Sequence, residues 1–179
     1  DGLSDAKSAG TNFTGSLLLG HQTTGVLDAA QYNTGVGLAS LDAITTGDNN
    51  TSLGNNSLSA NTTGSDNVAL GYNALVANTT KGQNIAIGRD ALAVQTDGGE
   101  FNVAVGAYSL DENTLGDKNV ALGYVALGKN TEASYNTGIG TESLKLTTTG
   151  ANNTALGNAA GDVISTGSQN VLLGASTDP

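Results

Sequence analysis

Apolar and polar residues follow a short pattern that returns along almost the whole chain. It is clearest from Asn67 to Leu75, NVALGYNAL, and returns as NIAIGRDAL from Asn84, NVAVGAYSL from Asn102 and NVALGYVAL from Asn119. Successive copies begin 17 residues apart, with one interval of 18 residues between Asn84 and Asn102. We number each copy from its asparagine, which is position 1. A fixed period of this length is the signature of a repeat architecture.

Two stretches of each copy have the pattern of a short strand. Positions 2 to 4 alternate a large, a small and a large residue before a glycine at position 5, which predicts a strand with one face buried. We expect the leucine and valine columns, at positions 2, 4 and 9, to form the core. The small residues at positions 3 and 8 would then form a smooth outer face. Positions 8 and 9, for example Ala74-Leu75, repeat the pattern and predict a second strand.

A polar loop closes each copy. The glycine in this loop is expected to supply a positive φ at the corner. The loop glycines are Gly47, Gly64, Gly99, Gly116, Gly150 and Gly167.

Seventeen residues cannot bury a core alone, so the copies must stack, each strand pairing in parallel with its equivalent about 4.8 Å away. The predicted fold is therefore all-β, a parallel β-solenoid (β-roll or β-helix) of about ten coils with two short strands per coil. It spans residues 16–179, after a lead-in at 1–15 that is flexible or the remainder of an earlier turn. Stacking aligns the asparagines of position 1 and predicts a ladder of amide hydrogen bonds. The ladder residues are Asn33, Asn50, Asn67, Asn84, Asn102, Asn119, Asn136, Asn153 and Asn170.

The composition limits which partners and which kinds of site the chain could have. The net charge of −10 and only six basic residues argue against nucleic acid and anionic membranes as partners. No cysteine is present, so disulfides and thiolate metal sites are excluded. No apolar run reaches the roughly 20 residues of a membrane span, so we expect no membrane insertion. His21 is the only histidine, and the acidic residues form no continuous column. We expect no catalytic residue, no cofactor and no metal.

Positions 6 and 7, just after the glycine, differ most between copies. They carry Tyr72, Asn73, Arg89, Tyr108 and Tyr124, and tyrosine rings can stack on sugars. A glycan or receptor contact is predicted here, beside the alternative of a variable solvent-facing turn.

A threonine column occupies position 13. A regular threonine array could order water against ice, or the hydroxyls could form hydrogen bonds at the corner as in an ST-turn. The neighbouring column is broken by Asp97, Leu115 and Glu132, which favours the corner bonds. The column comprises Thr45, Thr62, Thr79, Thr96, Thr114, Thr131 and Thr148.

The phrase NVALGYNAL followed by NTTGSDN resembles the repeats of bacteriophage and cyanophage tail fibres, in which NTAIGYxAL and NTTGS recur at this period. It is more distantly similar to the NSVAIGxxS coils in the heads of YadA-like trimeric adhesins. The resemblance covers residues 33–174. It implies parallel β-rolls, three chains side by side, and a location outside the cell or on a virion.

The function hypothesis is a non-enzymatic structural and adhesive fibre element that displays binding surfaces on a rigid rod. Its partners would be further copies of itself, as a homotrimer or stacked end to end, and a cell-surface glycan or receptor. Because position 4 of the last coil is still Leu173, we expect a longer fibre or docking of this end on another subunit. The alternatives are a self-stacking extracellular filament subunit, an ice-binding solenoid, and a glycan-degrading spike with a carboxylate pair.

Overall fold

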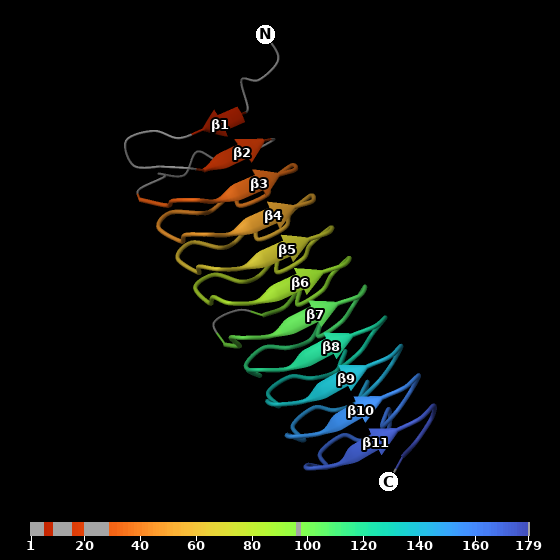
Figure 1. Cartoon of the computed structure of the whole chain (residues 1–179). Helices are drawn as coiled ribbons and strands as arrows, with labels where there is room; N and C mark the ends of the chain where they lie inside the picture. Colours follow the sequence, from red (N-terminus) through yellow and green to blue (C-terminus); the bar gives the residue numbers. More distant parts are fainter. Residues whose placement is uncertain (1–5, 9–15, 20–28, 96–97, 179) are drawn as a thin grey trace.

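The structure is a computed structural model that describes residues 6–8, 16–19, 29–95 and 98–178 and arranges them as a β-solenoid (Figure 1). One three-residue strand per coil pairs in parallel with the next, in register; Val68, for example, lies opposite Ile85. The first strand, β1, instead pairs antiparallel with β2. The bounds are β1 Ala6–Ser8, β2 Leu17–Leu19, β3 Thr34–Val36, β4 Thr51–Leu53, β5 Val68–Leu70, β6 Ile85–Ile87, β7 Val103–Val105, β8 Val120–Leu122, β9 Thr137–Ile139, β10 Thr154–Leu156 and β11 Val171–Leu173.

The predicted all-β parallel solenoid with a 17-residue coil is confirmed. Most of the lead-in predicted for 1–15 lies outside the described residues, which there include only β1. Nine steps of about 4.8 Å from β2 to β11 give a rod of about 43 Å.

Between its two end strands the sheet buries its small residues and exposes its large ones, so the prediction that positions 2 and 4 form the core is wrong, whereas the leucines of position 9 are buried as expected. Ala69 and Ala104, at position 3, have no exposed surface, whereas Leu53 and Leu122, at position 4, are 52% and 45% exposed. The alternation of large and small residues is as expected, but the opposite side of the strand faces the interior. Because side chains alternate between the two faces of a strand, this exchanges the buried and exposed positions along the whole strand.

The reason for the reversal is the narrow interior. Leucines from position 9 already fill the space behind the strands. A Cβ added to Gly35 at position 3 would lie only 2.7 Å from Cδ2 of Leu18 and 3.3 Å from Cδ1 of Leu41. From β3 to β10 position 3 therefore carries only a small residue, and the large neighbours at positions 2 and 4 point outward. The end strands β2 and β11 differ, because they carry buried leucines, Leu18 and Leu172, at position 3.

The second half of each coil is a turn, so the predicted second strand is wrong. Asn73 and Leu75 have φ of 55° and 52°, in the left-handed region. Ala74 and Leu75 are consequently both fully buried, whereas consecutive residues of a strand would point to opposite sides. Bulky residues rarely adopt this conformation, so the turn could not be predicted from the residue types at these positions. The stack holds it in place, for example through the Leu75 N–H, which donates to the Ala91 carbonyl at 3.0 Å.

The loop glycines are needed for space rather than for a positive φ. Of the six, only Gly99 has a positive φ, of 82°. A Cβ on Gly47 would collide with the carbonyl oxygen of Gly64 in the next coil. Here the expectation from sequence is corrected: the loops of successive coils approach so closely that a side chain cannot stand between them.

The asparagines of position 1 form a ladder that is continuous through their backbone N–H groups and is buried from Asn33 to Asn153. Oδ1 of Asn67 accepts the backbone N–H of Asn84 at 3.1 Å. Its Nδ2 donates to Oδ1 of Asn50 at 3.1 Å and to the loop carbonyl of Lys81 at 2.9 Å. In the first coil Ser16 replaces asparagine, and its Oγ accepts the Asn33 N–H at 2.8 Å. Each side chain thus satisfies a buried backbone donor of the following coil.

A second buried ladder, at position 12, was not predicted. Asn130 Nδ2 donates to Oδ1 of Asn113 at 2.8 Å and to the carbonyl of Ala133 at 3.0 Å. The same Ala133 carbonyl accepts Asn119 Nδ2 of the first ladder at 2.8 Å, so both ladders meet at one loop oxygen. The signal was present in the sequence, because an amide residue begins most polar loops. The buried residues of this column are Ile44, Asn61, Asn78, Gln95, Asn113, Asn130, Thr147 and Ile164.

The 18-residue coil keeps the bond from this column to the loop carbonyl by using a longer side chain, although Gln95 Oε1 is buried without a hydrogen-bond partner, so the ladder has no bond between Gln95 and Asn113. In ordinary coils the asparagine reaches a carbonyl three residues on, as Asn113 Nδ2 does to Gly116 at 3.0 Å. In the long coil Gln95 Nε2 reaches Gly99, four residues on, at 2.6 Å. The additional methylene of glutamine matches the additional residue in the loop.

Candidate binding edges

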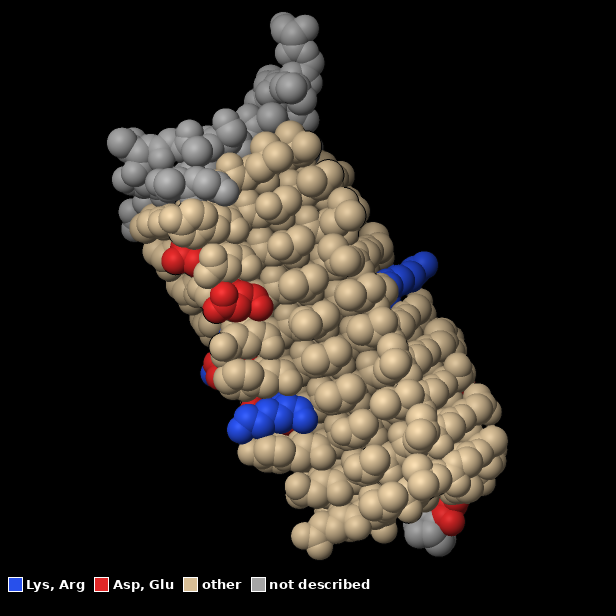
Figure 2. Space-filling view, viewed as in Figure 1, with Lys and Arg blue, Asp and Glu red and all other residues tan. Residues whose placement is uncertain are grey.

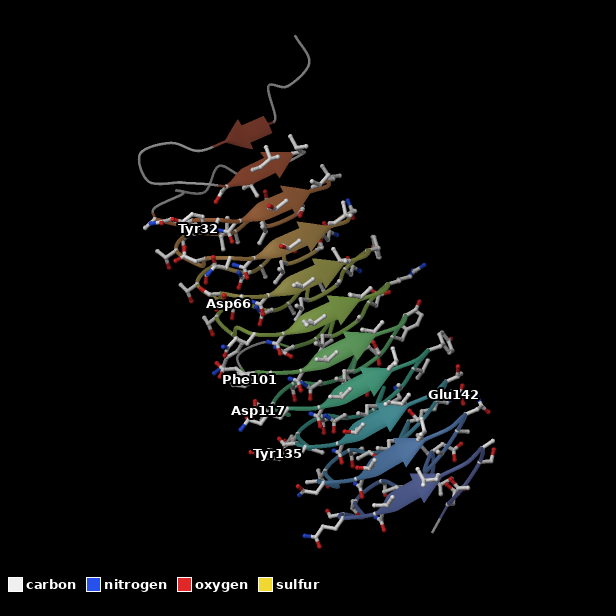
Figure 3. The ribbon with its side chains drawn as sticks, viewed as in Figure 1. Tyr32, Asp66, Phe101, Asp117, Tyr135 and Glu142 are labelled. Atoms are coloured by element: carbon white, nitrogen blue, oxygen red, sulfur yellow. The ribbon has the colours of Figure 1, made fainter. Side chains whose placement is uncertain are left out.

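The turns after β5 to β8 hold the residues predicted to contact a ligand. We call Tyr72, Asn73, Arg89, Tyr108 and Tyr124 the Tyr-Arg edge. Tyr72 is 46% and Tyr124 51% exposed, because position 6 follows the glycine that ends each strand and points away from the interior. Glu142 marks the continuation of the same edge in Figure 3. One residue per coil, about 4.8 Å apart, makes a strip rather than a pocket, and no pocket is found in the described part of the chain.

Hydrogen bonds between coils hold the carboxylate that pairs with the guanidinium of this edge. Asn56 Nδ2 donates to Asn73 Oδ1 at 3.3 Å, and Asn73 Nδ2 donates to Asp90 Oδ1 at 2.9 Å. Asp90 Oδ2 then accepts Nε of Arg89 at 3.1 Å. This places the Arg89 Cζ 5.4 Å from the centroid of the Tyr72 ring. The hydrogen bond to Asp90 raises the pKa of Arg89, with a smaller contribution from Tyr108.

Two further tyrosines continue the strip. The rings of Tyr108 and Tyr124 lie edge to face, with centroids 6.1 Å apart and an angle of 88° between their planes. The structure therefore brings Tyr72 to Arg89, and Tyr108 to Tyr124. Ring faces suit the C–H faces of sugars, and the fork of guanidinium donors suits hydroxyl and carboxylate oxygens.

A second aromatic edge, on the opposite side of the rod, was missed at position 17. Figure 3 labels Tyr32, Phe101 and Tyr135 along it, and they are 59%, 46% and 54% exposed. Lys118 lies between the last two, with Nζ 5.9 Å from the Phe101 ring centroid, 5.0 Å from that of Tyr135 and 3.1 Å from the Tyr135 hydroxyl. The signal was again available, because the residue before each asparagine varies as widely as positions 6 and 7.

Two acidic residues of the loops have structural roles. Asp48 Oδ1 accepts the backbone N–H of Gln31 at 2.7 Å, and Asp117 Oδ1 accepts that of Glu100 at 2.8 Å. Among the described residues, no group of three metal-ligating side chains is brought together.

Asp111 is the one described carboxyl group whose pKa is resolved as shifted. Burial raises its pKa to about 6; Glu112 adds to this, and Lys129 opposes it. Lys129 is itself paired with Glu112.

The threonines of position 13 use their hydroxyls within the solenoid. Thr45 Oγ1 donates to the carbonyl of Thr62 at 3.0 Å, and Thr62 Oγ1 to that of Thr79 at 3.0 Å. Thr114 does the same to Thr131 at 2.9 Å. These bonds favour the structural interpretation over an ice-ordering array, although the acceptor lies in the next coil rather than in the same corner.

Comparison with known protein families, curated proteins and solved structures gives no match at a significant level. The resemblance to fibre and adhesin repeats therefore rests on the motif and period alone. His21 lies outside the described residues. No helix that could cross a membrane occurs in the described ranges.

Proposed function

We propose that this chain is a non-enzymatic structural and adhesive element of a fibre, of the tail-fibre or surface-adhesin kind, on a virion or outside the cell. Its role would be to hold binding residues at fixed spacing along a rigid rod. The partners we propose are further copies of the chain and a cell-surface glycan or receptor.

One observation carries this proposal: a repeated, rigid scaffold bears an exposed strip whose side chains are ordered by the scaffold itself. Inter-coil bonds from Asn56 to Asn73 and from Asn73 to Asp90 hold the Asp90 carboxylate, which pairs with the guanidinium of its neighbour Arg89 before any ligand arrives. Holding side chains in place in advance lowers the entropy that binding would otherwise cost. Variation on a fixed scaffold is the arrangement expected of a recognition surface.

The adhesive part is tested on a glycan array and on cells. Tyr72→Ala with Arg89→Gln should reduce binding at least about tenfold, because a ring face and a charged donor are both removed. The matched control is Tyr135→Ala with Lys118→Gln, which removes a similar pair from the opposite edge. Equal loss in both variants, with folding intact, would contradict recognition by the Tyr-Arg edge. No binding by the unaltered protein to any glycan or cell would contradict the adhesive role.

A further inference from the structure

One side of the rod is a flat strip of large, uncharged side chains. It consists of positions 2 and 4 of strands β2 to β11, and we call it the aliphatic face. Leu53, Ile85, Leu122 and Leu156 on it are 37–52% exposed, whereas the leucines of position 9 are fully buried. Figure 2 shows charged side chains along the margins of the rod and a broad uncharged surface between them. The residues of the aliphatic face are Leu17, Leu19, Thr34, Val36, Thr51, Leu53, Val68, Leu70, Ile85, Ile87, Val103, Val105, Val120, Leu122, Thr137, Ile139, Thr154, Leu156, Val171 and Leu173.

The strip is about as large as the largest apolar patch on an ordinary monomer. Three residues span about 10 Å across it and ten strands about 43 Å along it, or roughly 430 Å² in projection. The largest apolar patch of an ordinary monomer is about 300–600 Å², and such patches commonly mark interaction sites. A half-exposed leucine forgoes about 1 kcal/mol of burial, and this shortfall recurs in coil after coil.

The chemistry of the strip identifies its occupant as the same chain. A partner that packs on every coil must present side chains at the same spacing of about 4.8 Å, which another copy of the solenoid does. Each copy carries a net charge of −10, so two copies repel least through a face without charges. An acidic or basic partner would find no charge on the strip to pair with.

Position 2 is aliphatic in the central coils, which carry Val68, Ile85, Val103 and Val120. Two coils on either side carry threonine, and the end coils carry Leu17 and Val171. No coil places a charged residue at this position.

We propose that the aliphatic face packs against the aliphatic face of a second copy, the two rods lying side by side with their coils in step. This rests on the fibre role proposed above and names the surface through which copies of the chain meet, which differs from the Tyr-Arg edge. The small residues expected at such an interface from sequence are instead buried inside each rod.

The test measures mass in solution by light scattering and sedimentation over a dilution series. The mass of the unaltered protein should be at least twice the 17.7 kDa of one chain. Ile85→Lys with Leu122→Lys should be monomeric, or associate at least about tenfold more weakly. The matched control is Val94→Lys with Leu146→Lys, because these residues are equally exposed, at 42% and 43%, but lie outside the face. It should assemble like the unaltered protein.

Two outcomes overturn the proposal: a monomeric unaltered protein at the highest concentration, or assembly that survives in the face variant. Circular dichroism reports whether each variant keeps its fold. If the lysine variant unfolds, Ile85→Thr with Val103→Thr and Val120→Thr replaces it, since four coils already carry threonine at position 2. This variant should associate more weakly, and undiminished association would overturn the proposal. A monomer that still binds glycan through Tyr72 and Arg89 would refute this interface and leave the adhesive proposal standing.

Discussion

The two amide ladders inside this solenoid tolerate substitution very differently. The first holds asparagine in nine successive coils and serine in the coil before them, whereas the second gives way to Ile44 at one end and to Thr147 and Ile164 at the other. The difference lies in what each side chain satisfies. Asn119 Oδ1 accepts the buried backbone N–H of Asn136 at 2.9 Å, and that N–H has no other acceptor among the described residues.

The second ladder is partly redundant. The Gly116 carbonyl accepts Asn113 Nδ2 at 3.0 Å, but it also accepts Asn102 Nδ2 at 2.8 Å from the first ladder. An isoleucine in place of an amide therefore leaves the loop oxygen with a partner. The residue type in a column therefore varies little where each side chain is the sole hydrogen-bond partner of a buried backbone group.

The largest expected effect comes from breaking the first ladder. Asn119→Ala leaves the Asn136 N–H buried without an acceptor, which should cost about 3 kcal/mol of unfolding free energy. Urea denaturation measures the loss. A cost below that of substitutions in the second ladder would refute the explanation given for the constancy of the first.

The long coil offers the next test. Gln95→Asn loses the 2.6 Å bond to Gly99 and leaves the gap of one methylene, a cost of about 2 kcal/mol. Deleting Gly98 in the same variant returns the coil to 17 residues and should recover most of the loss in the same denaturation experiment. If the deletion brings no recovery, glutamine is not matched to the inserted residue.

A substitution in the redundant ladder should cost less. Asn113→Ile imitates Ile44 and Ile164, and the Gly116 oxygen keeps Asn102 as donor, so we expect a loss of about 1 kcal/mol. The urea midpoint of this variant should lie above that of Asn119→Ala. Equal losses would show that the two ladders do not differ in redundancy.

The smallest effect is a gain. Asn130 Oδ1 is buried without a hydrogen-bond partner, because the next coil carries Thr147, whose hydroxyl donates to the Ile164 carbonyl at 3.0 Å. Thr147→Asn should extend the ladder by one rung and stabilise the protein by roughly 0.5–1 kcal/mol. Thermal unfolding at constant pH detects this, with Thr148→Asn as the control in the neighbouring column. An unchanged or lower midpoint would contradict the prediction.

Part of the candidate site followed from the sequence. Positions 6 and 7 were identified by their variation between copies, and the turn after each glycine placed them at one edge. The pairing of Arg89 with Tyr72 did not follow, because it depends on Asp90 in the same coil and Asn73 in the coil before it. The edge with Phe101 and Tyr135 was missed although position 17 varies as widely.

By itself, the sequence determined the period, the parallel stacking and the asparagine column, because each of these repeats residue by residue. It could not determine which side of the strand faces inward. Alternation fits either assignment, and the choice depends on the space left by Leu41 and its equivalents from elsewhere in the coil. Nor could the sequence reveal that the leucines of position 9 have a positive φ, because leucine has no intrinsic preference for the left-handed region. Only the tertiary structure decided these points, because stacking of coils supplies the hydrogen bonds that hold a strained backbone and limits the volume inside it.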